Sequence, residues 1–321
     1  MRVALTADDV GHRVVVRRRV HAADDRGRFS DVLGELVDFG ETSLTVRRRD
    51  GELVVIDHAL VAAAKPVPPA AVRRSTDREV ERIAALGWRG LEEQWLGGWL
   101  LRAGNGFTGR ANSVLPLEPP DRPVADALRF VTRWYAERGL PPLAQVPLPL
   151  ANELDAELAA AGWRSYNPTR FLTSSVSGLL DACPTRPDLP PVTYEASPGP
   201  AWLSGYQYRG RPLPDGAVSV LSNAAAPTFA SVRDSTGQLG VGRGVVDEGW
   251  LGVTAVTVIE SARRCGLGRQ LMRGLAEWGA ARGASQVYLQ VAEDNTAAIA
   301  MYDRLGFVTH HRYHYRIWPS G

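Results

Sequence analysis

The sequence predicts an α/β protein, in the broad sense that includes α+β. It consists of a small N-terminal all-β barrel followed by two related α/β domains with mixed sheets, the first degenerate. Short β-branched strands separated by turns fill the N-terminal segment. The rest of the chain repeats one order of elements, and only the second repeat carries a glycine loop. Because 321 residues exceed one ordinary core, we expect domains at 1–68, 69–188 and 189–321.

The N-terminal segment contains five predicted strands. Apolar runs such as "VVVRRRV" and "ELVVID" alternate with the turns "DDRGR", "DFGET" and "RRDGE", the last an Asp-Gly hairpin signal. Five strands in about 65 residues predict a small closed barrel, with a layout that resembles a Src-homology-type barrel. "KPVPPAAVRR" at its end predicts a proline-rich linker.

Two arginine clusters in this segment, 17–19 and 47–49, raise the question of nucleic-acid binding. No aromatic residues are interleaved for base stacking, and strand alternation leaves half of each cluster solvated. The chain's net charge is only +2, so it has no bulk attraction to a polyanion. The sequence therefore does not favour nucleic acid as a partner.

The compartment that the sequence indicates is the cytoplasm. Cys183 and Cys265 lie far apart without metal-ligand spacing, which predicts neither a zinc site nor a disulfide framework. The first residues include acids and no long apolar run, which is not typical of a signal peptide. No stretch approaches the roughly 20 apolar residues of a spanning helix, so no membrane partner is expected.

The second and third segments are related by an internal duplication. Trp134 and Trp278 each stand five residues before a glycine, and "AQV" at 144–146 aligns with "LQV" at 289–291. Further along, "AAGW" aligns with "RLGF". Both copies have the apolar spacing of helix, strand, helix and strand, in that order.

The duplication supplies an internal control. In the second copy, "VTAVTVIESARRCGLGRQL" predicts a strand that runs through a glycine turn directly into a helix. In the first copy, "RANSVLPLEPPDRPVADAL" has no glycine in the turn and has four prolines, which carry no amide hydrogen. The first copy is therefore expected to keep the scaffold without the anion site.

The glycine turn of the second copy predicts a diphosphate site. The first four amides of a helix lack internal partners and carry the positive end of the helix dipole. Gly266 and Gly268 remove side chains that would hold a phosphate away, and Arg263, Arg264 and Arg269 add charge. The turn lacks the lysine of a P-loop and the third glycine of a Rossmann fingerprint, which leaves the pattern R-x-x-G-x-G.

Residues 245–316 resemble the GNAT superfamily of N-acetyltransferases, which bind acetyl-coenzyme A, because "LQVAEDNTAAIAMYDRLGF" follows this loop at the family's spacing. The resemblance implies that the backbone of Val256 and Val258 pairs with pantetheine, and that the loop amides hold the pyrophosphate. The loop residues concerned are Arg263, Arg264, Cys265, Gly266, Leu267, Gly268 and Arg269. Asn295 is expected to cap its helix and, by the resemblance, to reach the cofactor. The three-part arrangement resembles tandem GNAT proteins with a small N-terminal barrel, of the kind found in high-GC bacteria.

Tyr302 is the expected catalytic acid. The resemblance implies that a tyrosine at this position protonates the departing thiolate, and a phenol with a pKa near 10 suits that leaving group. The first copy has Leu158 at the matching place, so it has kept the apolar shape and lost the hydroxyl. Packing of the tyrosine against the sheet is the alternative.

The general base is left open by the sequence. The position that matches a glutamate of some family members is Gly252, which cannot serve. Asp247, Glu248 and Glu260 are nearby acids with ordinary turn or strand-end positions, and relayed water is the alternative. "HHRYHYR" at 310–316 predicts a final strand, and no metal site is predicted.

The predicted function is transfer of an acetyl group from acetyl-coenzyme A to a primary amine of a small molecule or protein. Two alternatives stay open at this stage: a mycothiol-synthase-like acetyltransferase, and a non-catalytic acyl-coenzyme-A sensor or nucleic-acid-linked binding protein. A covalent role for Cys265 is conceivable because a helix N-terminus lowers a thiol's pKa, but the loop tolerates many residue types there. The acceptor and the oligomeric state are not predicted.

Overall fold

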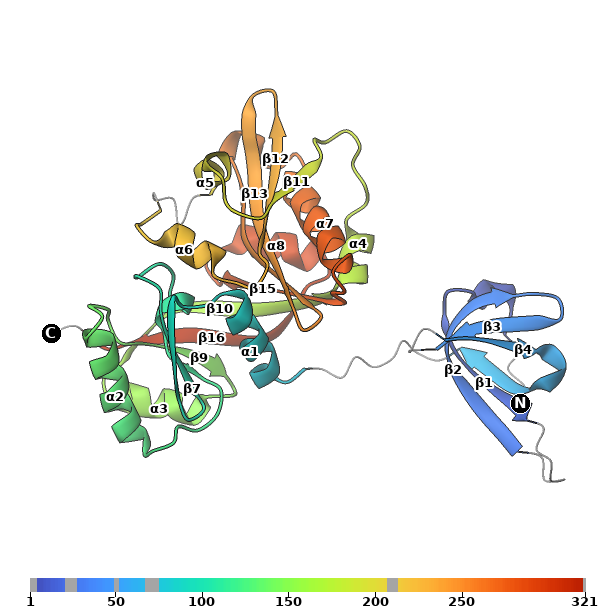
Figure 1. Cartoon of the computed structure of the whole chain (residues 1–321), viewed down its shortest axis with the longest axis horizontal. Coiled ribbons are helices and arrows are strands. Elements are labelled where there is room, and N and C mark those ends of the chain that lie inside the picture. Colours follow the sequence, from blue (N-terminus) through green and yellow to red (C-terminus); the bar gives the residue numbers. More distant parts are fainter. Residues whose placement is uncertain (1–4, 21–27, 49–51, 67–74, 207–212, 320–321) are drawn as a thin grey trace. The chain divides into compact units, whose positions relative to one another are not determined.

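The computed structural model describes residues 5–20, 28–48, 52–66, 75–206 and 213–319 (Figure 1). The expected linker "KPVPPAAVRR" lies outside these ranges except for its first two residues, which end a strand. Within the described ranges, every helix is too short or too polar to traverse a lipid bilayer.

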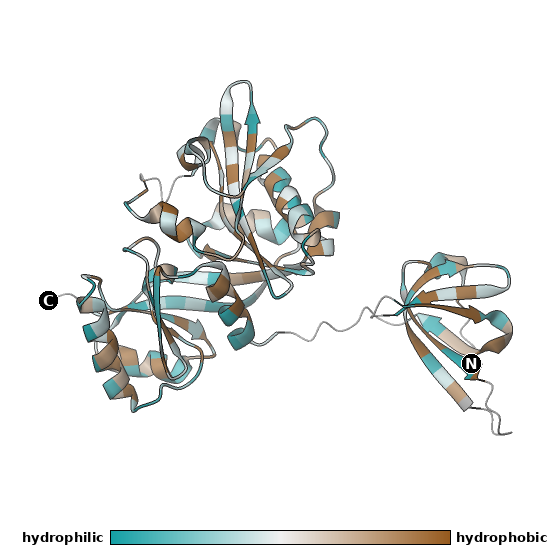
Figure 2. Cartoon of the chain, in the orientation of Figure 1, coloured by the Kyte–Doolittle hydropathy of each residue, from teal (hydrophilic) through white to brown (hydrophobic). Residues whose placement is uncertain are grey.

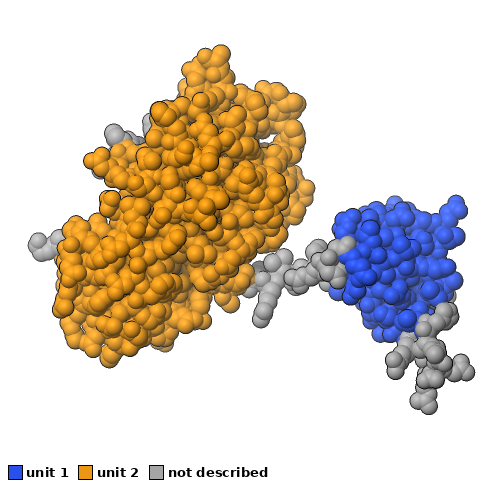
Figure 3. All heavy atoms as spheres, in the orientation of Figure 1, with its two compact units in different colours: residues 1–74 blue, residues 75–321 orange. Residues whose placement is uncertain are grey.

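The chain folds as two compact units, each with hydrophobic cores of its own. Hydrophobic residues occur along the strands of both units (Figure 2). The units comprise residues 1–74 and 75–321 (Figure 3). Each unit is described by itself below.

The first unit is a five-stranded antiparallel sheet in the order β4-β3-β2-β1-β5, which confirms the five predicted strands. The strands are β1 (Arg13–Val20), β2 (Arg28–Phe39), β3 (Ser43–Arg47), β4 (Leu53–Asp57) and β5 (Val61–Pro66). Their inward residues, including Val14, Val16, Leu36 and Val46, form one apolar cluster. Arg17 pairs with Asp31 at 2.9 Å, and Arg47 and Arg48 pair with Glu35 and Glu52, so acids match part of the arginine charge.

The second unit is built on an eight-stranded sheet in the order β11-β12-β13-β14-β15-β10-β16-β9, beside a small sheet β6-β7-β8. The large sheet comprises β9 (Leu143–Leu148), β10 (Arg164–Ser175), β11 (Val192–Glu195), β12 (Thr228–Asp234), β13 (Gly237–Asp247), β14 (Trp250–Val258), β15 (Gln286–Ala292) and β16 (Val308–Ile317). The small sheet comprises β6 (Glu92–Leu96), β7 (Trp99–Ala103) and β8 (Leu115–Pro116). The helices are α1 (Asp77–Gly87), α2 (Val124–Ala136), α3 (Asn152–Ala160), α4 (Val176–Ala182), α5 (Pro200–Gly205), α6 (Ala217–Ser222), α7 (Leu267–Ala280) and α8 (Thr296–Arg304).

The predicted duplication is visible in the order of elements. The first copy runs α2, β9, α3, β10 and the second runs α7, β15, α8, β16. The two copies exchange their last strands: β10 lies between β15 and β16, and β16 lies between β10 and β9. The boundary expected at residue 188 stays a prediction, and it falls between α4 and β11, within one compact unit.

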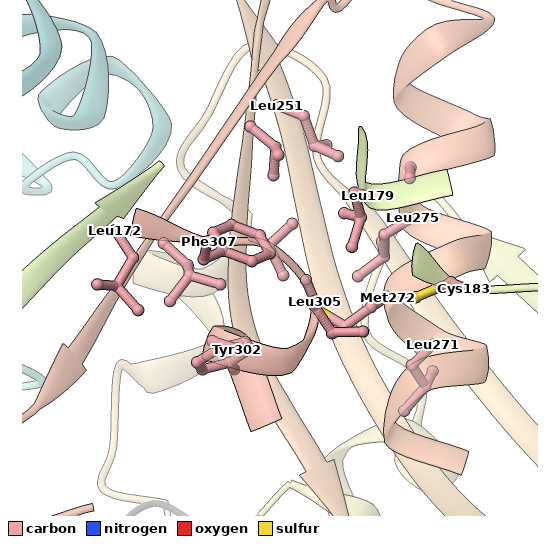
Figure 4. Packing of buried hydrophobic residues seen from close by; sticks show 14 of the residues in the cluster. Leu172, Leu179, Cys183, Leu251, Leu271, Met272, Leu275, Tyr302, Leu305 and Phe307 are labelled. Carbon is pink, nitrogen blue, oxygen red and sulfur yellow. The ribbon is translucent and has the colours of Figure 1, made fainter. Parts of the chain in front are cut away.

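The sheet has two faces with different neighbours. Leu172, Leu289 and Val291 pack in one core with residues of α7 and α8, and we call this side the α7 face (Figure 4). Phe171 and Tyr288 pack against α1 on the opposite side, the α1 face. Because neighbouring residues of a strand alternate between faces, Gln290, directly opposite Phe171 in the ladder, belongs to the α1 face.

Candidate functional site

Strands β14 and β15 separate part of the way along their length. They pair in parallel only through Trp250 with Gln286, Leu251 with Val287, and Gly252 with Tyr288. Beyond that point β14 continues to Val258 along β13, while β15 continues along β10. The backbone edges of the two strands therefore face an opening beyond Gly252.

Val256 and Val258 lie on the β14 side of this opening. The Ile259 amide donates to the Leu239 carbonyl of β13 at 2.9 Å, so the polar groups of the preceding residue, Val258, point away from β13. The Val258 carbonyl accepts a hydrogen bond from Arg263 Nε at 3.2 Å. Val256 lies in a bulge, marked by a register shift and by a φ of +57° at Ala255.

The loop before α7 exposes a row of backbone amides. Arg264 and Gly266 have φ angles of +63° and +94°, which turn the chain sharply into the helix. Gln270 is the first residue whose amide bonds back, to the Gly266 carbonyl at 3.0 Å. Among the described residues, no acceptor is paired with the amides from Arg264 to Arg269. The backbone therefore offers a run of donors at the positive end of a helix.

The two loop glycines are held close to other elements. A Cβ on Gly266 would come 3.1 Å from Arg186 Nη1, and one on Gly268 would come 3.0 Å from Met301 Sδ. Arg186, whose guanidinium pairs with Asp188, is a cation beside the loop that the sequence did not reveal. With the exposed Arg263, Arg264 and Arg269 it makes the entrance of the loop positive.

Cys265 and Leu267 complete the loop with different environments. Cys265 is exposed, and its thiol donates to the Arg263 carbonyl at 3.5 Å. Leu267 is buried in the core of the α7 face. Leu267 thus anchors the start of the helix, while the other loop side chains remain at the surface.

Asn295 caps α8, as predicted. Its Oδ1 accepts a hydrogen bond from the Ala298 amide at 3.2 Å. Asn152 of the first copy, which aligns with Asn295 in the repeat, is instead the first residue of its helix, after an Ala151 N-cap. The cap is therefore a feature of the second copy, and contact with a cofactor stays a prediction for Asn295.

Tyr302 lies on α8, inside the core of the α7 face (Figure 4). Its ring stands edge-on to Phe307 with centroids 5.7 Å apart. Burial raises the pKa of the Tyr302 phenol to about 12, so the hydroxyl keeps its proton over the physiological range. Leu158 takes the matching buried place on α3 in the first copy.

The nearby acids do not form an obvious base. Glu248 is paired with Arg82, and Glu260 is exposed in a short 3-10 turn. Burial raises the pKa of the Asp247 carboxyl. At Gly252 an added Cβ would clash with the Tyr288 hydroxyl, so the position that carries glutamate in some GNAT proteins has no room for a side chain here.

A cavity of about 340 Å³ opens on the α1 face, over β10, β15 and β16. Its lining comprises Gly106, Thr108, Gly109, Arg110, Asn112, Leu140, Pro141, Leu143, Tyr166, Asn167, Thr169, Gln290, Ala292, Tyr313 and Tyr315. Arg110 Nη1 and the Tyr313 hydroxyl both donate to Gln290 Oε1, at 2.8 and 3.1 Å. Among the described lining residues none is acidic, and Arg110 is the one cation.

The cavity wall contains strained backbone. Thr108 and Asn167 have φ angles of +63° and +52°, and a β-branched residue rarely adopts such a conformation. The Trp88 indole donates to Thr108 Oγ1 at 2.9 Å and helps to hold it there. Backbone strain concentrates at binding sites. This wall was not predicted from the sequence, where the glycine-rich stretch "GNGFTGR" is the signal that could have indicated it.

The first copy has a cavity at its loop before α2 and at the start of α3, the places that correspond to the anion loop and the start of α8 in the second copy. It measures about 580 Å³ and is lined by Pro116, Pro119, Pro120, Pro149, Glu118, Glu153 and Glu157, among others. Proline offers no backbone N–H donor. The lining also includes Arg78, which pairs with Glu118, so the carboxylates of Glu153 and Glu157 are the ones left to repel an anion. This composition agrees with the prediction that the first copy has lost the anion site.

Two family models match the chain. The model described as "Probable histone acetyltransferase Rv0428c C-terminal" matches residues 74–316, and the "Rv0428c N-terminal Sm-like domain" matches residues 8–65. The second match describes the N-terminal strands as Sm-like, where the sequence suggested a Src-homology-type layout.

Full-length relatives and solved structures agree with these matches. The probable histone acetyltransferase Rv0428c of Mycobacterium tuberculosis is 32% identical, covering 97% of this chain and 95% of the relative. The uncharacterized N-acetyltransferase YobR of Bacillus subtilis is 30% identical, covering 75% of this chain and 98% of the relative. A GCN5-related N-acetyltransferase from Kribbella flavida shares the fold, with a TM-score of 0.58 and 17% identity over 76% of this chain and 96% of that chain. A tandem GNAT protein from the clavulanic acid biosynthesis pathway also shares it, with a TM-score of 0.52 and 17% identity over 70% of this chain and 79% of that chain.

Proposed function

The chain belongs to the family of the probable histone acetyltransferase Rv0428c and is a GNAT N-acetyltransferase, and from this premise we propose that acetyl-coenzyme A binds in the opening between β14 and β15. The diphosphate is held by the loop before α7. The observation that carries the proposal is the run of six consecutive amides, 264–269, without acceptors among the described residues. Such a run at a helix N-terminus binds phosphate oxygens.

The arginines around the loop complete the diphosphate site. Arg263, Arg264 and Arg269 are exposed at its rim, and Arg186 reaches Gly266 from the segment after α4. Guanidinium groups bind phosphate oxygens through paired N–H donors. Arg263 then exchanges its hydrogen bond with the Val258 carbonyl for one with phosphate.

The pantetheine arm lies along β14. Release of Arg263 frees the Val258 carbonyl, and the bulge leaves the Val256 backbone beside the opening. An extended amide chain pairs with such an edge as an added strand does. In this proposal the thioester lies near the last β14–β15 pair, between the α7 face and the α1 face.

Tyr302 supplies the proton that the coenzyme A thiolate takes up. The phenol carries its proton at neutral pH because burial raises its pKa to about 12. The sulfur takes this proton as the carbon–sulfur bond breaks, and the Tyr302 phenolate regains a proton from water. Asn295 sets the start of the helix that carries it, and Met301, the residue before it, touches Gly268. Because Gly252 has no side chain to act as a general base, the acceptor amine gives its proton to water.

The acceptor enters through the 340 Å³ cavity on the α1 face. Gln290 lies two residues beyond the last β14–β15 pair, so the cavity reaches the thioester from the side opposite Tyr302. Arg110 is positioned to bind a carboxylate or another anionic group, and Tyr166 and Tyr315, stacked with centroids 5.5 Å apart, offer flat apolar surfaces. The lining favours a small primary amine with an anionic group over a lysine side chain flanked by cations.

Release of free thiol from acetyl-coenzyme A tests the acceptor class. A panel of primary amines is compared as matched pairs, each with a carboxylate and with that carboxylate amidated. We expect the carboxylated member to have the higher kcat/KM, by about tenfold or more if one charged hydrogen bond is lost. Arg110→Met should abolish the difference. Equal rates within each pair, or a preference for a lysine-rich peptide, would contradict this acceptor class.

A further inference from the structure

We propose that Asp77, His310 and His311 form a binding site for a divalent transition metal of the zinc type, separate from the acetyl-transfer site. The three residues come from the first turn of α1 and from β16. Their ligand atoms all lie within 4.8 Å of one another. Nitrogen and carboxylate ligands in this combination suit zinc.

A β-bulge brings the two adjacent histidines to the same side. In the ladder between β10 and β16, Phe171 pairs with His311 and Leu172 pairs with Thr309, so His310 is an extra residue without a partner. In a regular strand, neighbouring side chains point to opposite faces. A bulge breaks this alternation and can turn two adjacent side chains to the same side. The result is a distance of 3.1 Å between the Nδ1 atoms of His310 and His311.

Hydrogen bonds on the far side of each ring fix its orientation. His310 Nε2 lies 2.8 Å from the Ser75 carbonyl oxygen, which can only accept, so Nε2 carries the hydrogen. His311 Nε2 lies 2.8 Å from Glu81 Oε1, and Glu81 Oε2 accepts from the Gln145 amide at 2.9 Å. Both Nδ1 atoms are then left to present lone pairs to each other, an arrangement that a cation between them stabilises.

The outer contacts match those of metal-bound histidines. Such residues donate their second ring N–H to a carboxylate or a backbone carbonyl, which fixes the tautomer. For His311 the acceptor is the carboxylate of Glu81, and for His310 it is the backbone carbonyl of Ser75. Asp77 and Glu81 together supply two carboxylates, which match the charge of a divalent ion.

The distances admit one ion. Zinc–nitrogen bonds of about 2.0–2.1 Å to nitrogens 3.1 Å apart give an N–Zn–N angle of roughly 100°, near the tetrahedral value. Asp77 Oδ1 lies 3.3 Å from His310 Nδ1 and 3.9 Å from His311 Nδ1, and a small rotation of the carboxylate shortens the longer distance. The side chains of Asp77 and His310 are 23% and 13% exposed, so an ion can enter from solvent.

The site ties the start of α1 to the exchanged strand β16. Phe171, which stacks on His311 with centroids 4.7 Å apart, also packs against α1. A metal at this point joins an element that precedes the first copy to the last strand of the second. The expected role is therefore structural, and the readouts below are binding and thermal unfolding rather than activity.

Titration of the tag-free, metal-depleted full chain with Zn²⁺ and Co²⁺ tests the proposal. We expect one equivalent of Zn²⁺ in competition with a chromophoric chelator, and a Co²⁺ absorption spectrum of a low-symmetry nitrogen–oxygen site. His310→Ala and Asp77→Asn, both at partly exposed positions, should each weaken Zn²⁺ binding at least 100-fold. Glu81→Gln should weaken it 10- to 100-fold, as loss of an outer partner does. His12→Ala, at an exposed histidine of the first unit, is the matched control and should bind as the parent does.

Thermal unfolding gives a second readout. Zn²⁺ should raise the unfolding temperature of the parent chain and of His12→Ala, and leave that of Asp77→Asn unchanged. The proposal is overturned if the parent shows no stoichiometric binding at micromolar Zn²⁺, which would mean that the two histidines share a proton instead. It is also overturned if His310→Ala and Asp77→Asn bind as tightly as the parent.

Discussion

Gly268 lies against Met301: a Cβ on residue 268 would come within 3.0 Å of the Met301 sulfur. This contact joins the first turn of α7, where the diphosphate is proposed to bind, to the helix that carries Tyr302. The anion loop and the proposed acid are therefore parts of one packed assembly.

Replacing each loop glycine with alanine should show which effects fall on coenzyme A affinity and which fall on the free energy of unfolding. Gly268→Ala adds a methyl group where phosphate oxygens are expected, so affinity for coenzyme A should fall about tenfold or more. Among the described residues beyond the helix's own backbone, the atoms near this methyl group belong to the flexible end of Met301, and alanine favours a helix. The free energy of unfolding should therefore change by less than about 1 kcal/mol. Gly266→Ala, at a φ of +94°, should weaken binding and also cost about 1 kcal/mol or more of stability. Calorimetric titration and denaturant unfolding measure both quantities, and unchanged affinity in both variants would count against the loop as the anion site.

Tyr302→Phe should reduce turnover without weakening coenzyme A binding. Removal of a general acid typically costs 10²- to 10⁴-fold in rate. Its ring contact with Phe307 is retained, so the fold should persist. Single-turnover kinetics and a coenzyme A titration on the same protein make the comparison. If turnover persists at the parent rate, Tyr302 has only a packing role.

The pH profile should lack an alkaline fall caused by Tyr302. Burial raises its pKa to about 12, so the acid form persists below that pH, while the acceptor amine becomes more reactive as it loses its proton. The rate should therefore rise with pH and level off, without declining up to about pH 10. An alkaline decline below pH 10 that disappears in Tyr302→Phe would show a phenol with an ordinary pKa.

Asp155 should contribute to holding the exchanged strand. It lies on α3 of the first copy and accepts from His314 at 2.6 Å and from Arg316 at 2.8 and 3.0 Å, both on β16 of the second copy. These donors lower the pKa of the Asp155 carboxyl, so its stabilisation is present above the ordinary carboxyl pKa and is lost as the pH falls through the lowered value.

Asp155→Asn should therefore destabilise the second unit by about 1.5–3 kcal/mol at neutral pH. The difference from the parent should shrink as the pH is lowered below about 4. Urea unfolding at several pH values measures this difference. A loss that is independent of pH would mean that the carboxylate charge is not responsible.

Coenzyme A should bind with a stoichiometry of one per chain. The cavity of the first copy is lined by prolines and by Glu118, Glu153 and Glu157, of which only Glu118 is paired with the lining cation Arg78, so the lining disfavours an anion. Isothermal titration gives the number directly. A second equivalent that persists in Gly268→Ala would place a site in the first copy.

Local signals in the sequence predicted much of this arrangement. The R-x-x-G-x-G turn, the Asn295 cap and the repeated order of helices and strands follow from short-range patterns, and the structure contains all three. Each depends on residues a few positions apart.

Features that depend on distant pairing were not predictable in the same way. The exchange of β10 and β16 cannot be read from the sequence, because the alternation of apolar and polar residues in a strand is the same whichever strand it pairs with. The sequence predicted a strand and no metal site at 310–316, and the bulge that brings His310 and His311 to one side is visible only in the pairing of β16 with β10. Arg186 and the segment 106–112 approach the proposed site only through the tertiary fold.

A crystal structure of the chain with coenzyme A would decide whether the loop before α7 holds the diphosphate. We expect diphosphate oxygens within about 2.7–3.2 Å of amides between Arg264 and Arg269, with Arg263 turned away from the Val258 carbonyl. A diphosphate bound elsewhere, or loop amides paired with the protein's own side chains in the complex, would contradict it.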